Sequence, residues 1–179
     1  MRSLILVTSL AAACVALADG KKGVKAPAPG PVIGGPIQPK SGATLGGDFK
    51  VKTAADGKVT IEVTVSKAPA GDHAVHLHET GDCSSPDGKS AGPHWNPGKE
   101  NHGEWGHAPH HLGDIGNMKV GADGNGTIVL TTDQWTFKTG KPNDVEGKAL
   151  IIHEKIDDFK TQPAGNAGNR IGCAVLKTP

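Results

Sequence analysis

The chain has 179 residues, with 19 lysines and arginines against 18 aspartates and glutamates, and only 3% aromatic residues. This length allows one compact domain together with accessory segments. The near-neutral charge gives no reason to expect a nucleic acid or a membrane surface as a partner.

The first residues have the three parts of a secretory signal peptide, predicted over residues 1–18. Arg2 supplies the positive charge, residues 4–15 are apolar, and Ala16-Leu17-Ala18 matches a cleavage site between small residues. The apolar stretch is too short to favour a membrane span. Cleavage removes Arg2 and no acid, which leaves 19 − 1 = 18 basic against 18 acidic residues. We therefore expect an exported protein, periplasmic or extracellular, with lipid attachment at Cys14 as a minor alternative.

Residues 19–46 contain many Gly, Pro and Lys residues and little periodic hydrophobicity. We interpret them as a mostly disordered or extended linker, followed by a folded domain over residues 47–179. Prolines at positions 31, 36 and 39 suit an edge strand or a loop better than a central strand. The presence of a first strand in this stretch is therefore left open.

Alternating apolar and polar residues predict a series of short strands in the domain. Residues 49–53 and 59–65 alternate on either side of an Asp56-Gly57 turn and predict a hairpin. Further strands are expected at residues 75–78, 118–120, 127–131, 149–153 and 172–176. Two long stretches without periodicity, residues 80–117 and 154–171, are expected to be functional loops. Since no stretch has a helical period, the predicted fold class is all-β, an antiparallel sandwich or barrel.

Histidine is concentrated around the first of these loops. Eight of the nine histidines lie between His73 and His111, and the ninth is His153. Imidazole is the commonest metal ligand, and neutral nitrogen donors suit copper and zinc. Six of these histidines together with Asp114 are more ligands than one ion requires. The sequence therefore predicts a site for two transition-metal ions.

The ligand chemistry divides these residues into two sets that share one histidine. Three imidazoles and one carboxylate form the pattern of a closed structural zinc site that would order the long loop; these are His94, His102, His111 and Asp114. Four nitrogens in a near-planar set suit Cu(II); these come from His76, His78, His153 and a shared histidine. His94 is best placed to be shared, with both ring nitrogens deprotonated. Three histidines are expected not to be ligands: His73, His107 and His110.

Two cysteines, Cys83 and Cys173, remain after removal of the signal peptide. In an exported protein they favour a disulfide, with two free thiols as the alternative. The bridge would close a long loop and contribute roughly 4–5 kcal/mol in the chain-entropy model.

Six short motifs follow one another along the chain: HLHETGD, AGPHWNP, NHG, HHLGDIGN, IIHEKIDD and GNAGNRIGCAV. In this order they resemble the motifs of the copper–zinc superoxide dismutase family, over roughly residues 47–177. The resemblance implies a Greek-key antiparallel β-sandwich or barrel. It also implies one copper and one zinc ion per chain, and the conversion of two superoxide anions and two protons to oxygen and hydrogen peroxide by alternate reduction and oxidation of copper.

The resemblance also implies a role for each site residue. Copper is expected on His76, His78, His94 and His153, and zinc on His94, His102, His111 and Asp114. His94 would bridge the ions and carry a proton, Asp157 would link a copper histidine to a zinc histidine, and the disulfide would pair Cys83 with Cys173. Arg170 would guide the anion to copper, with an ordinary solvated loop arginine as the alternative.

Two other functions remain as alternatives. One is a non-catalytic exported protein that buffers or delivers copper or zinc, and the other is a plain β-sandwich interaction domain with incidental histidines. A transfer protein is expected to lack the bridging histidine or the guiding arginine, and both His94 and Arg170 are present. The expected partner is superoxide as substrate, with no nucleic acid and no membrane span. A homodimer is left open.

Overall fold

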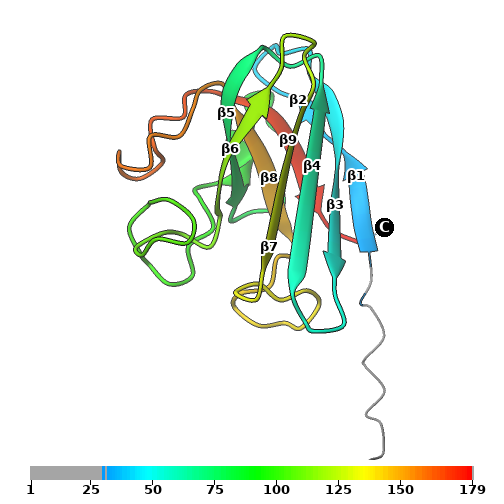
Figure 1. Cartoon of the computed structure of the whole chain (residues 1–179), viewed down its shortest axis with the longest axis vertical. Helices are drawn as coiled ribbons and strands as arrows, with labels where there is room; N and C mark the ends of the chain where they lie inside the picture. Colours follow the sequence, from blue (N-terminus) through cyan, green and yellow to red (C-terminus); the bar gives the residue numbers. More distant parts are fainter. Residues whose placement is uncertain (1–29, 31, 179) are drawn as a thin grey trace, which may run out of the picture.

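The computed structural model describes residue 30 and residues 32–178, so the predicted signal peptide lies outside the described residues. Within them, one antiparallel sheet curves into a nearly closed barrel (Figure 1). Its nine strands in the described range are β1 (Val32–Pro36), β2 (Gln38–Pro39), β3 (Gly46–Thr53), β4 (Val59–Ser66), β5 (Gly71–His78), β6 (Asp114–Val120), β7 (Gly126–Thr132), β8 (Lys148–His153) and β9 (Arg170–Leu176). The one helix among the described residues is a short 3₁₀ turn, η1 (Lys89–Ala91), and none is long and apolar enough to cross a membrane.

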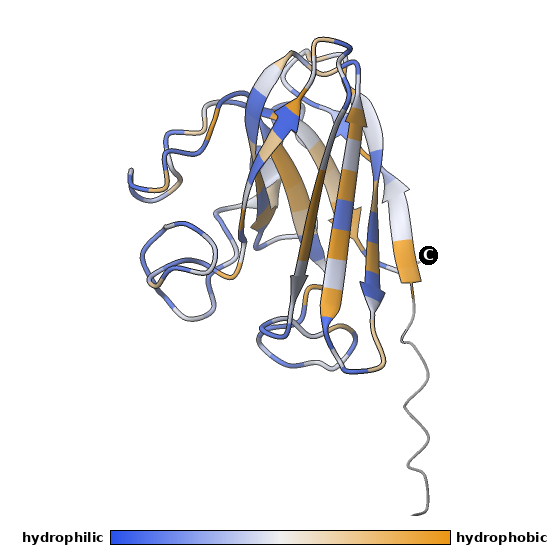
Figure 2. Ribbon diagram, viewed as in Figure 1, coloured by the Kyte–Doolittle hydropathy of each residue, from blue (hydrophilic) through white to orange (hydrophobic). Residues whose placement is uncertain are grey.

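The strand order around the sheet is β1-β3-β4-β7-β6-β5-β8-β9-β2. The predicted hairpin is formed by β3 and β4, with Phe49 opposite Val63 and Val51 opposite Ile61. Every second residue of β4 is buried, and Figure 2 shows the matching alternation of apolar and polar bands along this strand. The all-β prediction is confirmed, and the buried apolar faces of β3 and β4 belong to the core inside the barrel.

The N-terminal strands close the barrel. β1 pairs with β3 at one end of the strand order, and after Ile37 the chain continues into β2, which pairs with β9 at the other end. Ile33 and Ile37 are buried in the core. The composition of residues 19–46 predicts a linker, whereas residues 32–36 and 38–39 form two edge strands. Both strands lie at edges, where glycine and proline are tolerated and few residues need to be buried.

β5 is buried on both faces from His73 to His78. Val75 and Leu77 belong to the core inside the barrel, so the alternating residues His76 and His78 face outwards. The outer face is covered by two long loops, which we call the first loop (residues 79–113) and the second loop (residues 154–169). Both loops project from the same side of the barrel, coloured green and orange in Figure 1.

Candidate metal centre

Strand pairing and loop contacts bring the predicted ligands together. β5 pairs with β8, which ends at His153, so this residue lies near His76 and His78. The first loop is hydrogen-bonded along β5: the Trp95 amide donates to the Leu77 carbonyl at 2.8 Å, and an isolated bridge joins His78 to His94. The regular sheet therefore fixes three of the histidines, and the loop adds His94 beside them.

The first ligand group lies at the outer face of β5 and consists of His76, His78, His94 and His153. One ring nitrogen from each lies within 4.8 Å of the others, and all four residues are buried. These atoms (His76 Nδ1, His78 Nε2, His94 Nε2 and His153 Nε2) have no hydrogen-bond partner within the described structure. One unpartnered buried polar atom costs about 1–3 kcal/mol. Four converging in one place fit a cation, and four nitrogens suit Cu(II).

The remaining ring nitrogens of this group are held by the protein. His78 Nδ1 donates to the Gly92 carbonyl at 2.8 Å, and His76 Nε2 donates to Asp157 Oδ2 at 2.8 Å. The Nδ1 atom of His153 lies 3.5 Å from the Gly168 carbonyl. These contacts orient the rings and leave the opposite nitrogens pointing towards one another.

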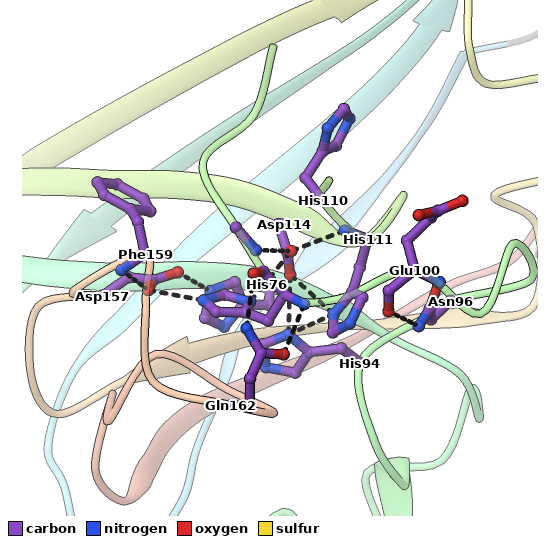
Figure 3. A network of polar contacts seen from close by, with 12 residues as sticks. His76, His94, Asn96, Glu100, His110, His111, Asp114, Asp157, Phe159 and Gln162 are labelled. Atoms are coloured by element: carbon purple, nitrogen blue, oxygen red, sulfur yellow. Dashed lines mark hydrogen bonds and ion pairs between the residues drawn. The ribbon is translucent and has the colours of Figure 1, made fainter. Parts of the chain in front are cut away.

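The second ligand group surrounds the carboxylate of Asp114. The Nδ1 atoms of three histidines lie near its oxygens, at 2.9 Å for His94, 3.0 Å for His102 and 3.2 Å for His111. The carboxylate is itself anchored by main-chain amides, since Oδ2 accepts from Gly103 at 3.1 Å and from His111 at 2.8 Å (Figure 3). Three imidazoles and one carboxylate form the donor set of a closed zinc site.

The ring of His94 takes part in both groups. Its Nδ1 faces Asp114, whereas its Nε2 belongs to the unpartnered nitrogens of the first group. One imidazole therefore presents one nitrogen to each group, as expected for a histidine shared between the two ligand sets.

Asp157 joins the two groups from the second loop. Its Oδ2 accepts from His76 Nε2 at 2.8 Å, and its Oδ1 accepts from His102 Nε2 at 2.9 Å. The side chain of Asn117 on β6 fixes the Asp157 main chain through two hydrogen bonds, at 2.8 and 3.0 Å. A Cβ atom at Gly165 would lie 1.8 Å from Asp157 Oδ1, so the second loop can approach this closely only with glycine there.

The buried carboxylates and imidazoles change one another's protonation. Burial raises the pKa of Asp114, but hydrogen bonds from His102, His111 and His94 outweigh this and hold it far below its usual value. Burial lowers the pKa of His102, but hydrogen bonds to Asp114 and Asp157 outweigh this and raise it to about 9. Burial and the nearby His76 lower the pKa of His94 to about 4. At pH 7 the metal-free protein therefore holds a proton on His102, while His94 is neutral.

An open cavity of about 890 Å³ leads to the first group, and its wall includes His78, His94, His153 and Arg170. The guanidinium of Arg170 donates to the Gly88 carbonyl through Nη1 at 2.8 Å and to the Gly92 carbonyl through Nη2 at 2.7 Å. The Gly92 carbonyl also accepts from His78. Arg170 is therefore a fixed cation in the cavity wall beside the first group.

The three histidines expected not to be ligands lie outside both groups. His73 is buried, and its ring nitrogens contact the carbonyls of His153 at 2.8 Å and Pro69 at 2.9 Å. His107 and His110 are not buried, and the ring of His110 meets that of Trp105 edge-on, with 4.9 Å between ring centroids. Hydrogen bonding or packing accounts for His73 and His110.

The predicted disulfide between Cys83 and Cys173 is present, with the Cα atoms 5.8 Å apart. It joins the first loop to β9, three residues beyond Arg170. The loop that supplies the carbonyl partners of Arg170 is thus covalently attached to the strand that begins with this arginine.

Sequence reasoning missed two amide side chains that support the site, Gln162 and Asn117. Gln162 Oε1 accepts from the His102 amide at 2.8 Å, and its Nε2 donates to the His102 carbonyl at 2.9 Å. Amides in these positions have no fixed spacing from the ligands that they support, so no sequence signal marks them.

Comparison with known proteins shows a consistent set of relatives. The family model described as copper/zinc superoxide dismutase (SODC) matches residues 46–176. The superoxide dismutase-like protein YojM of Bacillus subtilis (strain 168) is 38% identical over 134 residues, which is 73% of this chain and 68% of that protein. The Cu-Zn superoxide dismutase 1 of Aquifex aeolicus (strain VF5) is 37% identical over 141 residues, which is 77% of this chain and 83% of that protein. The crystal structure of a superoxide dismutase-like protein from Bacillus subtilis has a TM-score of 0.71 at 32% identity and covers 80% of this chain and 97% of that chain.

Proposed function

The chain belongs to the copper/zinc superoxide dismutase family, and from this premise we propose that it is an active superoxide dismutase. The proposed reaction converts two superoxide anions and two protons into one molecule of oxygen and one of hydrogen peroxide. The observation that carries the proposal is the set of four unpartnered imidazole nitrogens beside a fixed arginine in an open cavity. A buffering protein needs the nitrogens but has no need of the arginine.

We assign one copper ion to the first group and one zinc ion to the second. The copper ligands would be His76, His78, His94 and His153, and the zinc ligands would be His94, His102, His111 and Asp114. Copper would supply the one-electron oxidation and reduction, since zinc has no redox chemistry. Binding at the second group would tie the first loop to β6, so part of its binding energy would stabilise the fold.

Arg170 would attract and orient the substrate anion. Two of the five N–H donors of its guanidinium are occupied by the Gly88 and Gly92 carbonyls, which leaves donors for a small anion in the cavity. A charged donor forms short, strong hydrogen bonds to an anionic oxygen. Both carbonyls belong to the first loop, so the hydrogen bonds that hold the arginine form within the protein itself. The arginine is therefore in place before the anion arrives.

His94 would supply one of the two protons. His94 lines the cavity, its Nδ1 faces Asp114, and its Nε2 belongs to the first group. In the part of the cycle in which Nε2 is not a metal ligand, this nitrogen would take up a proton from water and pass it to the reduced oxygen species. Water in the open cavity would supply the second proton. Asp157 takes no proton in this scheme and orients His76 and His102.

We also propose that the protein is exported, to the periplasm or to the outside of the cell. The N-terminal pattern predicts a signal peptide. The disulfide between Cys83 and Cys173 supports export, because disulfides persist mainly in oxidising compartments.

Metal analysis paired with a superoxide-consumption assay on the same preparation tests the proposal. We expect one copper and one zinc per chain, and a rate of superoxide loss far above that of the metal-free protein. Binding of both metals without superoxide consumption would favour the non-catalytic metal-binding alternative. Absence of both metals after reconstitution would favour an interaction domain.

A further inference from the structure

A short N-terminal segment contacts both parts of the chain that hold Arg170. From these contacts we infer that Lys40 and Ser41 are positioning residues for Arg170. They act on its main chain and on the loop whose carbonyls hold its guanidinium. Both residues precede residues 46–176, which the family model matches. The inference rests on the proposed function, because it concerns how an anion is received at the metal centre.

Ser41 joins the start of β9 to the first loop. Its Oγ donates to the main-chain carbonyl of Arg170 at 2.8 Å, and its amide donates to the Pro86 carbonyl at 2.9 Å. Ser41 has a φ of 51°, in the left-handed region that residues other than glycine rarely occupy. Such a backbone persists only where surrounding contacts fix it, and these two hydrogen bonds are contacts of that kind.

Lys40 links the first loop to β9 through its side chain and its main chain. Its side chain is only 8% exposed, and its ammonium donates to the Cys83 carbonyl at 2.5 Å. Its own amide donates to the Ile171 carbonyl at 2.9 Å, next to Arg170. A lysine is seldom buried without an ionic partner, and this one forms no ion pair within the described structure. Its burial therefore points to a geometric role in holding the loop against β9.

We call the contacts of Lys40 and Ser41 with the first loop and β9 the clamp. Gly88 connects this clamp to the guanidinium of Arg170. Its carbonyl accepts from Arg170 Nη1, and it follows Cys83 and Pro86, the two points at which Lys40 and Ser41 hold the loop. A Cβ atom at Gly88 would lie 3.2 Å from Arg170 Cβ and 3.7 Å from Lys40 Cγ, so both side chains pack directly on this glycine. Movement of residues 83–88 would therefore displace the Gly88 carbonyl and leave the guanidinium of Arg170 held by Gly92 alone.

Two variants remove the clamp without changing any residue of the metal centre. Ser41→Gly deletes the hydrogen bond to Arg170, and glycine adopts the left-handed backbone without strain, so this variant is expected to fold normally. Lys40→Met deletes the bond to Cys83 but keeps an unbranched apolar stem. Lys52→Met, on the exposed side of β3, is the control for loss of one positive charge.

Nuclear magnetic resonance of the arginine side chain gives a measurement that is independent of catalysis. Arg2 and Arg170 are the only arginines in the sequence, so labelling the full chain with ¹⁵N-arginine gives few side-chain signals. The signals that disappear in Arg170→Lys are those of Arg170. In the zinc-loaded, copper-free wild type we expect separate, slowly exchanging Nη signals for Arg170. In Ser41→Gly and Lys40→Met these signals should merge, while Lys52→Met should match the wild type.

Azide, a small anion, then tests whether the position of Arg170 affects anion binding in the copper- and zinc-loaded protein. We expect both clamp variants to bind azide roughly three- to tenfold more weakly at unchanged metal content, the range that loss of one hydrogen bond gives. Unchanged Arg170 signals in both variants would overturn the inference. A wild type that binds both metals and does not consume superoxide would instead overturn the proposed function, and the side-chain signals would still test the clamp.

Discussion

At the scale of single residues, Arg170 is the group whose charge is expected to matter most for the rate. Arg170→Glu should lower the second-order rate constant for superoxide by roughly tenfold or more, because it replaces an attraction for the anion by a repulsion. The decrease of the rate with added salt should also become weaker, since salt screens this attraction. Stopped-flow measurements over a range of ionic strength test both effects.

Lys119→Glu is the matched control for Arg170→Glu, because it makes the same charge change at an exposed position on β6. It should alter the rate much less, since the effect of a charge weakens with its distance from the cavity. An equal effect of the two substitutions would mean that net charge, and not the position of Arg170, determines the rate.

His153 separates the two metal groups. It belongs to the first group alone, so His153→Ala should remove most copper and abolish activity while zinc remains bound. His107→Ala, at a histidine outside both groups, should retain both ions and full activity. Metal analysis of the two purified variants gives the answer. Equal loss of copper and zinc from His153→Ala would contradict the assignment of separate ligand sets.

His102 makes zinc binding depend on pH. Its pKa is raised to about 9, so the metal-free protein carries a proton on this ring at pH 7. Zinc must displace that proton, whereas Asp114 is already ionised and releases none. Zinc affinity should therefore rise by about tenfold per pH unit from pH 7 to about pH 9 and then level off. Loading at pH 7 should release about one proton from His102.

Zinc titrations in several buffers with different ionisation enthalpies measure this proton release directly. Repeating them at pH 10, above the pKa of His102, is the internal control, because the ring is then already neutral. A zinc affinity that does not change between pH 7 and pH 9 would show that His102 is not protonated in the metal-free protein.

At the scale of elements, the two loops have almost no regular structure and are ordered by contacts with the barrel and with each other. Gln162 of the second loop makes two hydrogen bonds to the main chain of His102 in the first loop, at 2.8 and 2.9 Å. Gln162→Ala should weaken zinc binding by about tenfold, the lower end of the effect of groups that support metal ligands.

Competition with a zinc chelator measures the affinity of the Gln162 variant. Gln134→Ala is a matched control, because Gln134 is exposed outside both loops and its side chain forms no hydrogen bond within the described residues. If the two variants bind zinc equally well, the contact between the loops does not contribute to the zinc site.

The strands differ in how well the sequence predicts them, for a physical reason. β4 has one face in the core and one towards solvent, so its apolar and polar residues alternate and its position is evident. β1 and β2 pair at the edges and contain glycine and proline, and Val32 is 66% exposed, so their composition resembles that of a linker. Their place is determined by closure of the barrel, which is a property of the whole sheet.

The residues of the site also divide into those that the sequence predicts and those that it does not. The ligand candidates could be found because few side chains bind copper or zinc, and the histidines are concentrated in one stretch. The carbonyls of Gly88 and Gly92 could not be found, because a main-chain acceptor has the same chemistry in every residue. The clamp formed by Lys40 and Ser41 depends on the path of the chain after β2, which local patterns do not encode.

At the scale of the whole molecule, three kinds of link hold the loops to the barrel: hydrogen bonds, the ligand groups and the disulfide. The disulfide has the longest reach, because it joins residues separated by 90 positions. The Cys83→Ala/Cys173→Ala double variant should therefore lower the free energy of unfolding by about 2–5 kcal/mol, chiefly by allowing the unfolded chain more freedom. It leaves both ligand groups intact, so copper and zinc content should not change.

Urea unfolding of the double variant at matched metal saturation measures this loss, since bound metal also stabilises the folded state. The second-order rate constant should fall as well, because the bridge holds the first loop next to Arg170. A variant with the wild-type urea midpoint and rate constant would show that the ligand groups alone fix the loop, and that the disulfide contributes neither stability nor position.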